Sequence, residues 1–444
     1  MPSADRPIVT WRAAAADDGA VSDVARREGA FRLREEPDFA RFWTGQSVSL
    51  IGSQVTMMAL PLTAIIILDA DEVDQGLLFF CQYLPALLFG LQVGTIVDRF
   101  TKRRLLVMAD VMRALLVTSV VLLYAVDQLS LWALMFIAFL LGAFDVLAAV
   151  GGQSFIPKLV PEPRLMDANG KLQKVTTFAE VSGNSLAGLL VQALTPPLAL
   201  LVDAVSFLAS AVTLGRVREA GAPVPAADGA EAPQALDGFL FLFRDARLRY
   251  ISLCNATSNF FSAMMVALYL LYATQALGFA PGVVGVILTV ASGIALVANT
   301  VTAQSTRRLG VRGTLVAGQL VMAAGCLVLP ATGGSMGVKS VLLVVSHSVF
   351  VIGMVAFTIT QLTYRQSVTP EYMQGRVHAG NHMLTYGSYA AGALMGGLVG
   401  DWIGMRETLV VGALGHVLAA VWLLPRRAWN TQAQTGLEEA DVHS

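Results

Sequence analysis

The sequence is poor in charged residues. They make up 14% of its 444 positions, whereas about a quarter of the residues of a soluble protein are charged. Hydrophobic residues make up 55%, and the mean hydropathy is +0.64. These values exclude an ordinary soluble globular protein and indicate a chain that lies largely in a membrane. The net charge is −1, so no excess of basic residues suggests a nucleic-acid partner.

Cysteine is scarce as well. Cys81, Cys254 and Cys326 are the three cysteines of the chain, and all lie in apolar runs without the spacing of a metal site. We interpret them as core residues and expect neither a metal nor a cofactor. The sequence also lacks the Gly-x-x-x-x-Gly-Lys-[Ser/Thr] pattern of ATP-binding loops and any Ser-His-Asp arrangement. It therefore predicts neither an enzyme nor ATP-driven transport by these residues.

Long apolar runs dominate the sequence instead. A helix of about 20 apolar residues spans a bilayer, and we count twelve such runs. They cover residues 42–68, 76–97, 104–126, 131–155, 171–194, 198–216, 250–275, 282–304, 312–330, 338–363, 377–400 and 407–424. We therefore predict an all-α membrane protein with twelve transmembrane helices in two six-helix bundles.

Polar segments separate and flank these bundles. Residues 217–237 are rich in Ala, Pro, Gly and acid, a composition that cannot bury a core. Gly238–Tyr250 carries phenylalanines near arginines and is predicted to form an amphipathic helix on the membrane surface. The N-terminal segment has no apolar core and is not a signal peptide. The predicted parts are a disordered leader (1–37), an N-terminal bundle (38–216), a linker with the amphipathic helix (217–249), a C-terminal bundle (250–425) and a tail (426–444).

Lysine and arginine are concentrated on one side of the predicted membrane. They cluster in the connections that follow the even-numbered spans, whereas the opposite connections carry only Lys339 and Arg406. Basic connections are retained in the cytoplasm. We therefore predict a multi-pass protein of the cell membrane with both termini and the linker in the cytoplasm.

The densest group of charges lies in the short connection Gly94–Arg104. It places Asp98 next to four cations between two apolar runs, and Gly94 is expected to let a neighbouring helix approach. A degraded copy, Arg307–Arg312, follows the eighth span and lacks the aspartate. Pro161-Glu162 and Pro370-Glu371 likewise precede the fifth and eleventh spans, so the two halves look like weak repeats.

The connection Gly94–Arg104 resembles the Gly-x-x-x-Asp-Arg-x-x-Arg-Arg motif of the major facilitator superfamily. Phe42–Leu50, Asp110-x-x-Arg113 and Leu201–Phe207 are similar to the branch that includes macrolide efflux pumps and siderophore exporters. The resemblance implies transport by alternating access. It also implies a gate in which Asp98 faces the start of the eleventh span, where the helix dipole favours an anion. The gating residues carried over are Gly94, Asp98, Arg99, Arg103 and Arg104.

Two positions depart from the pattern that the resemblance implies. Asn184 replaces the proline that antiporters of this superfamily carry in the fifth span, and Ser53 replaces an aspartate that many relatives carry after Gly52. Both departures weaken the case for proton exchange.

Ionisable residues at membrane depth are functional candidates because burying them is costly. Asp145 has no basic residue on its own helix face, and Glu180 lies in the middle of a rather polar helix. We predict that either could carry a proton, with a carboxylate held by neighbouring polar groups as the alternative. Asp110 and Arg113 can pair along one helix, and Asp203 is interpreted as local and structural.

Amides, methionines and aromatic rings predict a substrate cavity with few charges. Such a lining suits bulky amphipathic cargo, although about half of these residues are expected to serve helix packing instead. The candidates are Gln46, Gln54, Met57, Met58, Asn255, Asn259, Asn299, Gln361 and Tyr386.

The function predicted from these features is secondary active export of a hydrophobic or amphipathic small molecule, with protons as the coupling ion. Membrane lipids are expected as further partners, and the protein is expected to be a monomer. Two alternatives stay open. One is a lysophospholipid flippase without tight proton coupling, and the other is a membrane receptor or scaffold that transports nothing.

Overall fold

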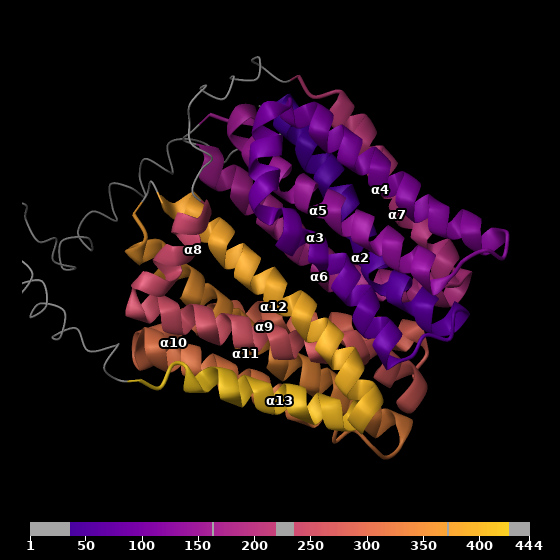
Figure 1. The fold of residues 1–444 in the computed structure, drawn as a ribbon, viewed down its shortest axis with the longest axis vertical. Helices are drawn as coiled ribbons and strands as arrows, with labels where there is room; N and C mark the ends of the chain where they lie inside the picture. The colour runs from indigo at the N-terminus through magenta and orange to yellow at the C-terminus, as the bar shows by residue number, and fades with distance from the viewer. Residues whose placement is uncertain (1–35, 162–163, 219–234, 371–372, 426–444) are drawn as a thin grey trace, which may run out of the picture.

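The computed structural model describes residues 36–161, 164–218, 235–370 and 373–425. Within these ranges, a few side chains lie outside the description, among them those of Asp98, Arg99 and Asn299. The predicted leader and tail and most of the linker fall almost wholly outside the described residues. All regular secondary structure in the described part is helical (Figure 1).

Six helices form the N-terminal half and match the first six predicted spans. They are α2 (Pro37–Ile67), α3 (Glu72–Arg99), α4 (Lys102–Ala125), α5 (Leu131–Leu159), α6 (Leu165–Leu194) and α7 (Pro196–Gly215). Side-chain caps fix several of their starts. The Asp71 carboxylate accepts a hydrogen bond from the Asp74 amide at 2.9 Å at the start of α3, and the Ser130 hydroxyl accepts one from the Ala133 amide at the start of α5.

The C-terminal half covers the other predicted spans. Its elements are α8 (Ala235–Arg244), α9 (Ala246–Leu271), a π-helical turn η2 (Tyr272–Ala276), α10 (Pro281–Val328), α11 (Met336–Val368), α12 (Gln374–Ile403) and α13 (Met405–Val421). The element α10 contains both the eighth and ninth predicted spans as two helices that are separated at Gly310. The φ of 69° and ψ of 173° of Gly310 are not helical, and a glycine adopts them without strain.

The prediction of one amphipathic helix over Gly238–Tyr250 is wrong. Helix α8 ends at Arg244, and the Asp245 carboxylate accepts a hydrogen bond from the Leu248 amide at 2.8 Å. That cap starts α9 at Ala246. The arginines that follow Asp245 therefore belong to the first turn of the seventh span.

Eight helices of the described part are long and apolar enough to cross a membrane. The remaining predicted spans are helical too, but α13 is shorter, α6 and α12 are more polar, and the first part of α10 has a short apolar stretch, Pro281–Ile294. The predicted all-α membrane fold is confirmed.

The helices pack into two groups, which Figure 1 separates by colour: indigo to magenta for the first half, and red through orange to yellow for the second. In the first group, α7 packs on α2 and α4, and α5 packs on α3 and α4. In the second, α12 and α13 pack on α9, and α10 packs on α11 and α13. Helix pairs α3–α12 and α6–α10 make the main contacts between the groups.

The two groups touch closely at one end of these pairs. We name it the acidic end, after the α2–α3 connection with Asp69 and Asp71, and we name the opposite end, at the α3–α4 connection Phe100–Thr101, the basic end. At the acidic end, a Cβ placed on Gly76 of α3 would lie 2.8 Å from the Ala393 carbonyl oxygen and from the Gly397 Cα of α12. Only residues without large side chains permit this contact.

The same helices are not in close contact at the basic end. No described heavy atom lies within 4 Å of a Cβ placed on Gly90 or Gly94 of α3, or on Gly293 of α10. The close helix approach expected at Gly94 is therefore absent from this conformation. The halves are packed together at the acidic end and part toward the basic end.

An internal repeat relates the two halves. Thr195, between α6 and α7, has φ 84° and ψ 151°, and Gly404, between α12 and α13, has φ 100° and ψ 153°. We call the difference between these two residue numbers the repeat interval. The same interval links Asp69 to Gly278, which both have positive φ, and links Pro161 to Pro370, whose carbonyls accept matching bonds of 2.9 Å three residues on.

The contacts between the halves obey the same repeat. Gly285 of α10 packs on Asn184 and Gly188 of α6, as Gly76 packs on Ala393 and Gly397. Each residue of the first set is related to one of the second by the repeat interval. The weak repeats predicted from the sequence thus extend to the backbone and to the packing of the two interfaces.

Candidate functional site

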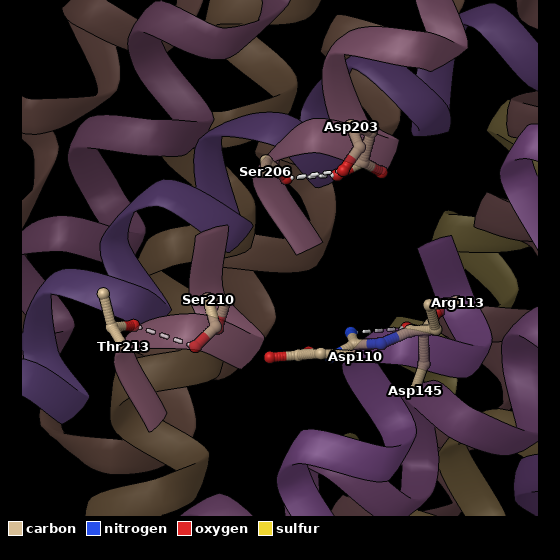
Figure 2. Close-up of polar contacts among 7 residues, drawn as sticks. All are labelled: Asp110, Arg113, Asp145, Asp203, Ser206, Ser210 and Thr213. Atoms are coloured by element: carbon tan, nitrogen blue, oxygen red, sulfur yellow. Dashed lines mark hydrogen bonds and ion pairs between the residues drawn. The ribbon is translucent and has the colours of Figure 1, made fainter. Parts of the chain in front are cut away.

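A cluster of buried charges lies inside the N-terminal half. Helix α4 places Asp110 and Arg113 three residues apart on one face, and α5 brings Asp145 to the same guanidinium (Figure 2). Arg113 Nη2 donates to Asp110 Oδ1, and Arg113 Nη1 donates to Asp145 Oδ1 at 3.0 Å. One cation thus joins two carboxylates from two helices.

Burial differs sharply within this cluster. The side chains of Asp110 and Arg113 are 1% and 8% exposed, whereas that of Asp145 is 51% exposed. The Arg113 guanidinium also lies over the Phe207 ring of α7, 4.4 Å from its centroid. Asp145 is therefore the accessible member, and Arg113 links it to the buried core. The expectation that Asp145 has no basic neighbour on its own helix holds, but α4 supplies the cation that the sequence pattern did not place.

Asp203 forms a second polar group at the contact of α2 and α7. It is fully buried, its Oδ2 accepts a hydrogen bond from the Thr56 hydroxyl at 2.5 Å, and its Oδ1 accepts one from the Ser206 hydroxyl at 2.7 Å. Figure 2 shows Asp203 and Ser206 on one helix, apart from the Arg113 cluster. The sequence offered only a local role for Asp203, because nothing in it showed that Thr56 and Gly52 of α2 face this carboxylate.

Glu180 lies apart from both groups. Its side chain is exposed on α6 and forms no ion pair with the described residues, and its carbonyl accepts a hydrogen bond from the Asn184 amide at 2.9 Å. It lies one turn from Asn184, at the interface with α10. The two proton-carrying candidates, Asp145 and Glu180, are therefore on different helices and in different surroundings.

Three of the predicted cavity amides come together in the C-terminal half. Asn255 Nδ2 donates to the Thr385 hydroxyl at 2.9 Å, Gln361 Nε2 donates to Asn255 Oδ1 at 3.2 Å, and Asn259 Nδ2 donates to the same oxygen at 3.0 Å. This network joins α9, α11 and α12. It satisfies these amides internally, so they hold helices together as well as offering polar groups.

The other cavity candidates are dispersed. Met58 is 4% exposed and belongs to the hydrophobic core, so its assignment to the lining is wrong, whereas its neighbour Met57 is 50% exposed. Gln54 packs on Gly183 of α6, and Gln46 is half-buried on α2. The side chain of Asn299 lies outside the described part.

Aromatic residues meet where α3 and α12 touch. Tyr386, the aromatic cavity candidate, stacks on Tyr83, with ring centroids 6.0 Å apart, and Tyr389 meets Tyr83 edge-on at 4.6 Å. The His382 ring lies 5.0 Å from Tyr386 on the same helix. This aromatic group joins the two halves between the closed acidic end and the parted basic end.

The gating motif is described in part. Lys102 Nζ donates to the Val97 carbonyl at the end of α3, and Arg103 Nη1 donates to the Val217 carbonyl beyond α7 at 3.1 Å. Arg104 is exposed. Lys102 and Arg103 thus bind backbone carbonyls at or near helix ends. Asp98 and Arg99 lie in the last turns of α3, but their side chains are outside the described part.

The chain belongs to the major facilitator superfamily and is a multi-pass membrane transporter. The sequence profile described as Major Facilitator Superfamily matches residues 42–386 and 251–443.

Curated relatives are similar at low identity. The transporter YfiS of Bacillus subtilis (strain 168), described as an uncharacterized MFS-type transporter, is 24% identical over 89% of this chain and 94% of its own. The multidrug efflux pump Tap of Mycolicibacterium fortuitum is 23% identical over 83% of this chain and 91% of its own. Macrolide efflux protein A of Streptococcus pyogenes is 23% identical over 40% of this chain and 44% of its own.

Solved transporter structures share the fold. The nucleoside transporter NupG (D323A mutant) has a TM-score of 0.71 at 13% identity, covering 87% of this chain and 99% of its own. A bacterial homologue of the iron transporter ferroportin in an inward-facing state has a TM-score of 0.68 at 16% identity, covering 87% of this chain and 98% of its own.

Proposed function

We propose that this protein exports a hydrophobic or amphipathic small molecule, such as a drug, a siderophore or another natural product, in exchange for protons. The observation that carries the proposal is the ion cluster of Asp110, Arg113 and Asp145 within a membrane-spanning bundle. Ionisable groups at this depth are costly to keep and are typical of ion and proton pathways. The names of two relatives, a multidrug efflux pump and a macrolide efflux protein, support the export direction.

We assign the basic end, together with both termini, to the cytoplasmic side of the cell membrane. The concentration of Lys and Arg in its connections supports this orientation. The parted basic end then corresponds to an inward-facing conformation, ready to receive cargo from the cytoplasm or the inner leaflet. In the opposite state, Gly94, Asp98, Arg99, Arg103 and Arg104 would close this end against the start of α12.

Asp145 is the stronger candidate for the proton-coupled residue of the cargo site. Its exposed carboxylate is held by Arg113, so protonation of Asp145 would release that cation, while Glu180 has no comparable charged neighbour in the described part. Proton and cargo binding would then compete at the same group.

Transport in proteoliposomes with an imposed pH gradient tests the proposal. The probes are a radiolabelled macrolide, a siderophore and a lysophospholipid, and the variants are Asp145→Asn and Glu180→Gln, with Asp127→Asn in the exposed α4–α5 connection as the control. Gradient-dependent movement of a probe that Asp145→Asn abolishes and Asp127→Asn preserves would support it. Equal movement of a probe with and without the gradient would refute proton coupling. If the lysophospholipid were the one probe that moved in this way, the result would favour a flippase. No movement of any probe would favour a receptor or scaffold.

A further inference from the structure

Asp203 is a buried carboxylate that forms no ion pair with the part of the chain that the structure describes. Its side chain is fully buried, and both of its oxygens accept hydrogen bonds from hydroxyls, those of Thr56 and Ser206. A carboxylate enclosed in a membrane protein with only neutral donors carries a high desolvation cost when it is ionised. Protonation removes that cost.

This carboxylate fits against α2 because α2 has a glycine, Gly52, at the point of contact. A Cβ placed on Gly52 would lie 2.5 Å from Asp203 Oδ1 and still closer to the Ser206 hydroxyl. Even alanine at position 52 would displace the group. The carboxylate therefore lies against the α2 backbone at Gly52.

The charges around Asp203 do not balance it. Helix α2 contributes only the Thr56 hydroxyl, α4 contributes Asp110 and Arg113, and α5 contributes Asp145. Helix α6 carries Glu180, which forms no ion pair with the described residues. Arg113 donates to Asp110 and Asp145, and no cation among the described residues forms an ion pair with Asp203.

The repeat provides a comparison within the same molecule. The counterparts of Gly52, Asp203 and Ser206 at the repeat interval are Phe261, Gly412 and Gly415. In the C-terminal half, the Phe261 ring of α9 packs on Gly415 of α13, next to Gly412. The equivalent helix pair therefore has no carboxylate at this contact; its ionisable group is the neighbouring His416 of α13, which contacts Ser258 and Ser262 of α9. The architecture does not require a carboxylate at this contact, which argues against a purely structural role for Asp203.

The charged neighbours are likewise confined to one half. The repeat counterparts of Asp110 and Arg113 are Gln319 and Met322. Gln319 Oε1 lies 3.3 Å from the Nδ1 of the buried His416, so this position keeps a polar network but no carboxylate. Among the described residues, the buried carboxylates Asp110 and Asp203 both lie in the N-terminal half.

We infer that Asp203 is a proton-binding site of the transport cycle, distinct from the cargo-facing Asp145. A proton from water binds the Asp203 carboxylate and is released from the same group, and the hydroxyl of the half-buried Thr56 links it to the accessible face of α2. When Asp203 is ionised, it attracts Arg113, which lies over Phe207, one turn along α7. That attraction weakens the hold of Arg113 on Asp145 and couples the two carboxylates.

The inference rests on the proposed proton coupling, but a substrate-free measurement tests it separately. Infrared spectra of the full-length protein in lipid nanodiscs, recorded across a pH titration, report the C=O stretch of protonated carboxyl groups. We expect a titrating band that Asp203→Asn removes and that the exposed-site control Asp127→Asn retains. Because the other Asp and Glu residues also give C=O bands when they are protonated, the readout is the difference between the titrations of the parent and the variant. A difference for Asp203→Asn that contains no titrating band would refute the inference.

Two further measurements keep the inference testable. If Asp203→Asn does not fold, Thr56→Val removes one hydroxyl donor and should shift the titration midpoint; an unchanged midpoint would refute the inference. In proteoliposomes with a radiolabelled macrolide, the ratio of gradient-driven transport to counterflow should fall about tenfold or more in Asp203→Asn, within the usual range of coupling between sites. An equal loss of both activities would indicate a structural role. Failure of every probe to move would count against the proposed export function and leave the infrared result standing.

Discussion

Replacement of Arg113 by methionine should destabilise the N-terminal half strongly. The guanidinium is 8% exposed, donates to Asp110 and Asp145, and packs on Phe207. Arg113→Met leaves the 1% exposed Asp110 as an uncompensated buried carboxylate. Breaking a buried ion pair by removing one partner costs about 3–5 kcal/mol. We expect a loss of that size in the free energy of unfolding.

The repeat supplies a matched variant that should recover this loss. Gln319 and Met322 occupy the counterpart positions in the C-terminal half, so Asp110→Gln combined with Arg113→Met copies a pair that the same fold already accepts. Replacing a whole buried ion pair with groups of similar volume is often neutral or stabilising. Asp145 can remain charged in this variant because its side chain is 51% exposed. We expect stability within about 1 kcal/mol of the parent.

Reversible unfolding in mixed micelles measures both variants against the parent protein. A strongly destabilised Arg113→Met with a recovered double variant would support the reasoning. If Arg113→Met alone were as stable as the parent, the ion cluster would make no net electrostatic contribution to the free energy of unfolding. If the double variant were as unstable as the single one, the loss would come from packing on Phe207 instead. Gradient-driven transport should be lost in both, because both lack the cation that links the carboxylates.

Three further predictions concern other parts of the fold. Asp98→Asn should impair transport while leaving membrane insertion intact, and unchanged transport would show that the charges of this connection only set topology. Thr195→Gly should raise the unfolding free energy by about 1 kcal/mol, because a β-branched residue at φ 84° is strained; unfolding in micelles checks this, and a loss of stability would contradict it. Gly397→Leu should abolish transport at unchanged expression, because even a Cβ there would lie 2.5 Å from the Glu72 carbonyl oxygen; normal transport would show that the acidic-end contact need not form.

The positions of the spans could be predicted because hydropathy reports them directly. All twelve predicted runs are helical, including the polar α6 and α12, which contain no proline. Helix ends were less accessible, since they depend on side-chain contacts. The Asp245 cap divides the predicted amphipathic helix in two, and the non-helical backbone at Gly310 separates the eighth span from the ninth.

The candidate site could be predicted only as a list of residues. Periodicity along one helix identified the Asp110–Arg113 pair, but the Arg113–Asp145 contact joins two helices and depends on their rotation. The contacts of Asp203 with α2 could not be predicted for the same reason, because they depend on the Thr56 hydroxyl and on the missing side chain of Gly52 on another helix. Pairing between helices follows from packing, which no single span encodes.

The contact at the acidic end has a consequence for how the halves can move. Gly76 packs on Ala393 and Gly397, and Gly285 packs on Asn184 and Gly188. At these positions of both interfaces, backbone atoms contact backbone atoms. A surface of this kind has shallow relief, because few long side chains interlock across it. One half can therefore tilt against the other without first separating interlocked side chains. The two interfaces thus allow one half to tilt against the other, and a small tilt at the acidic end produces a wide separation at the basic end.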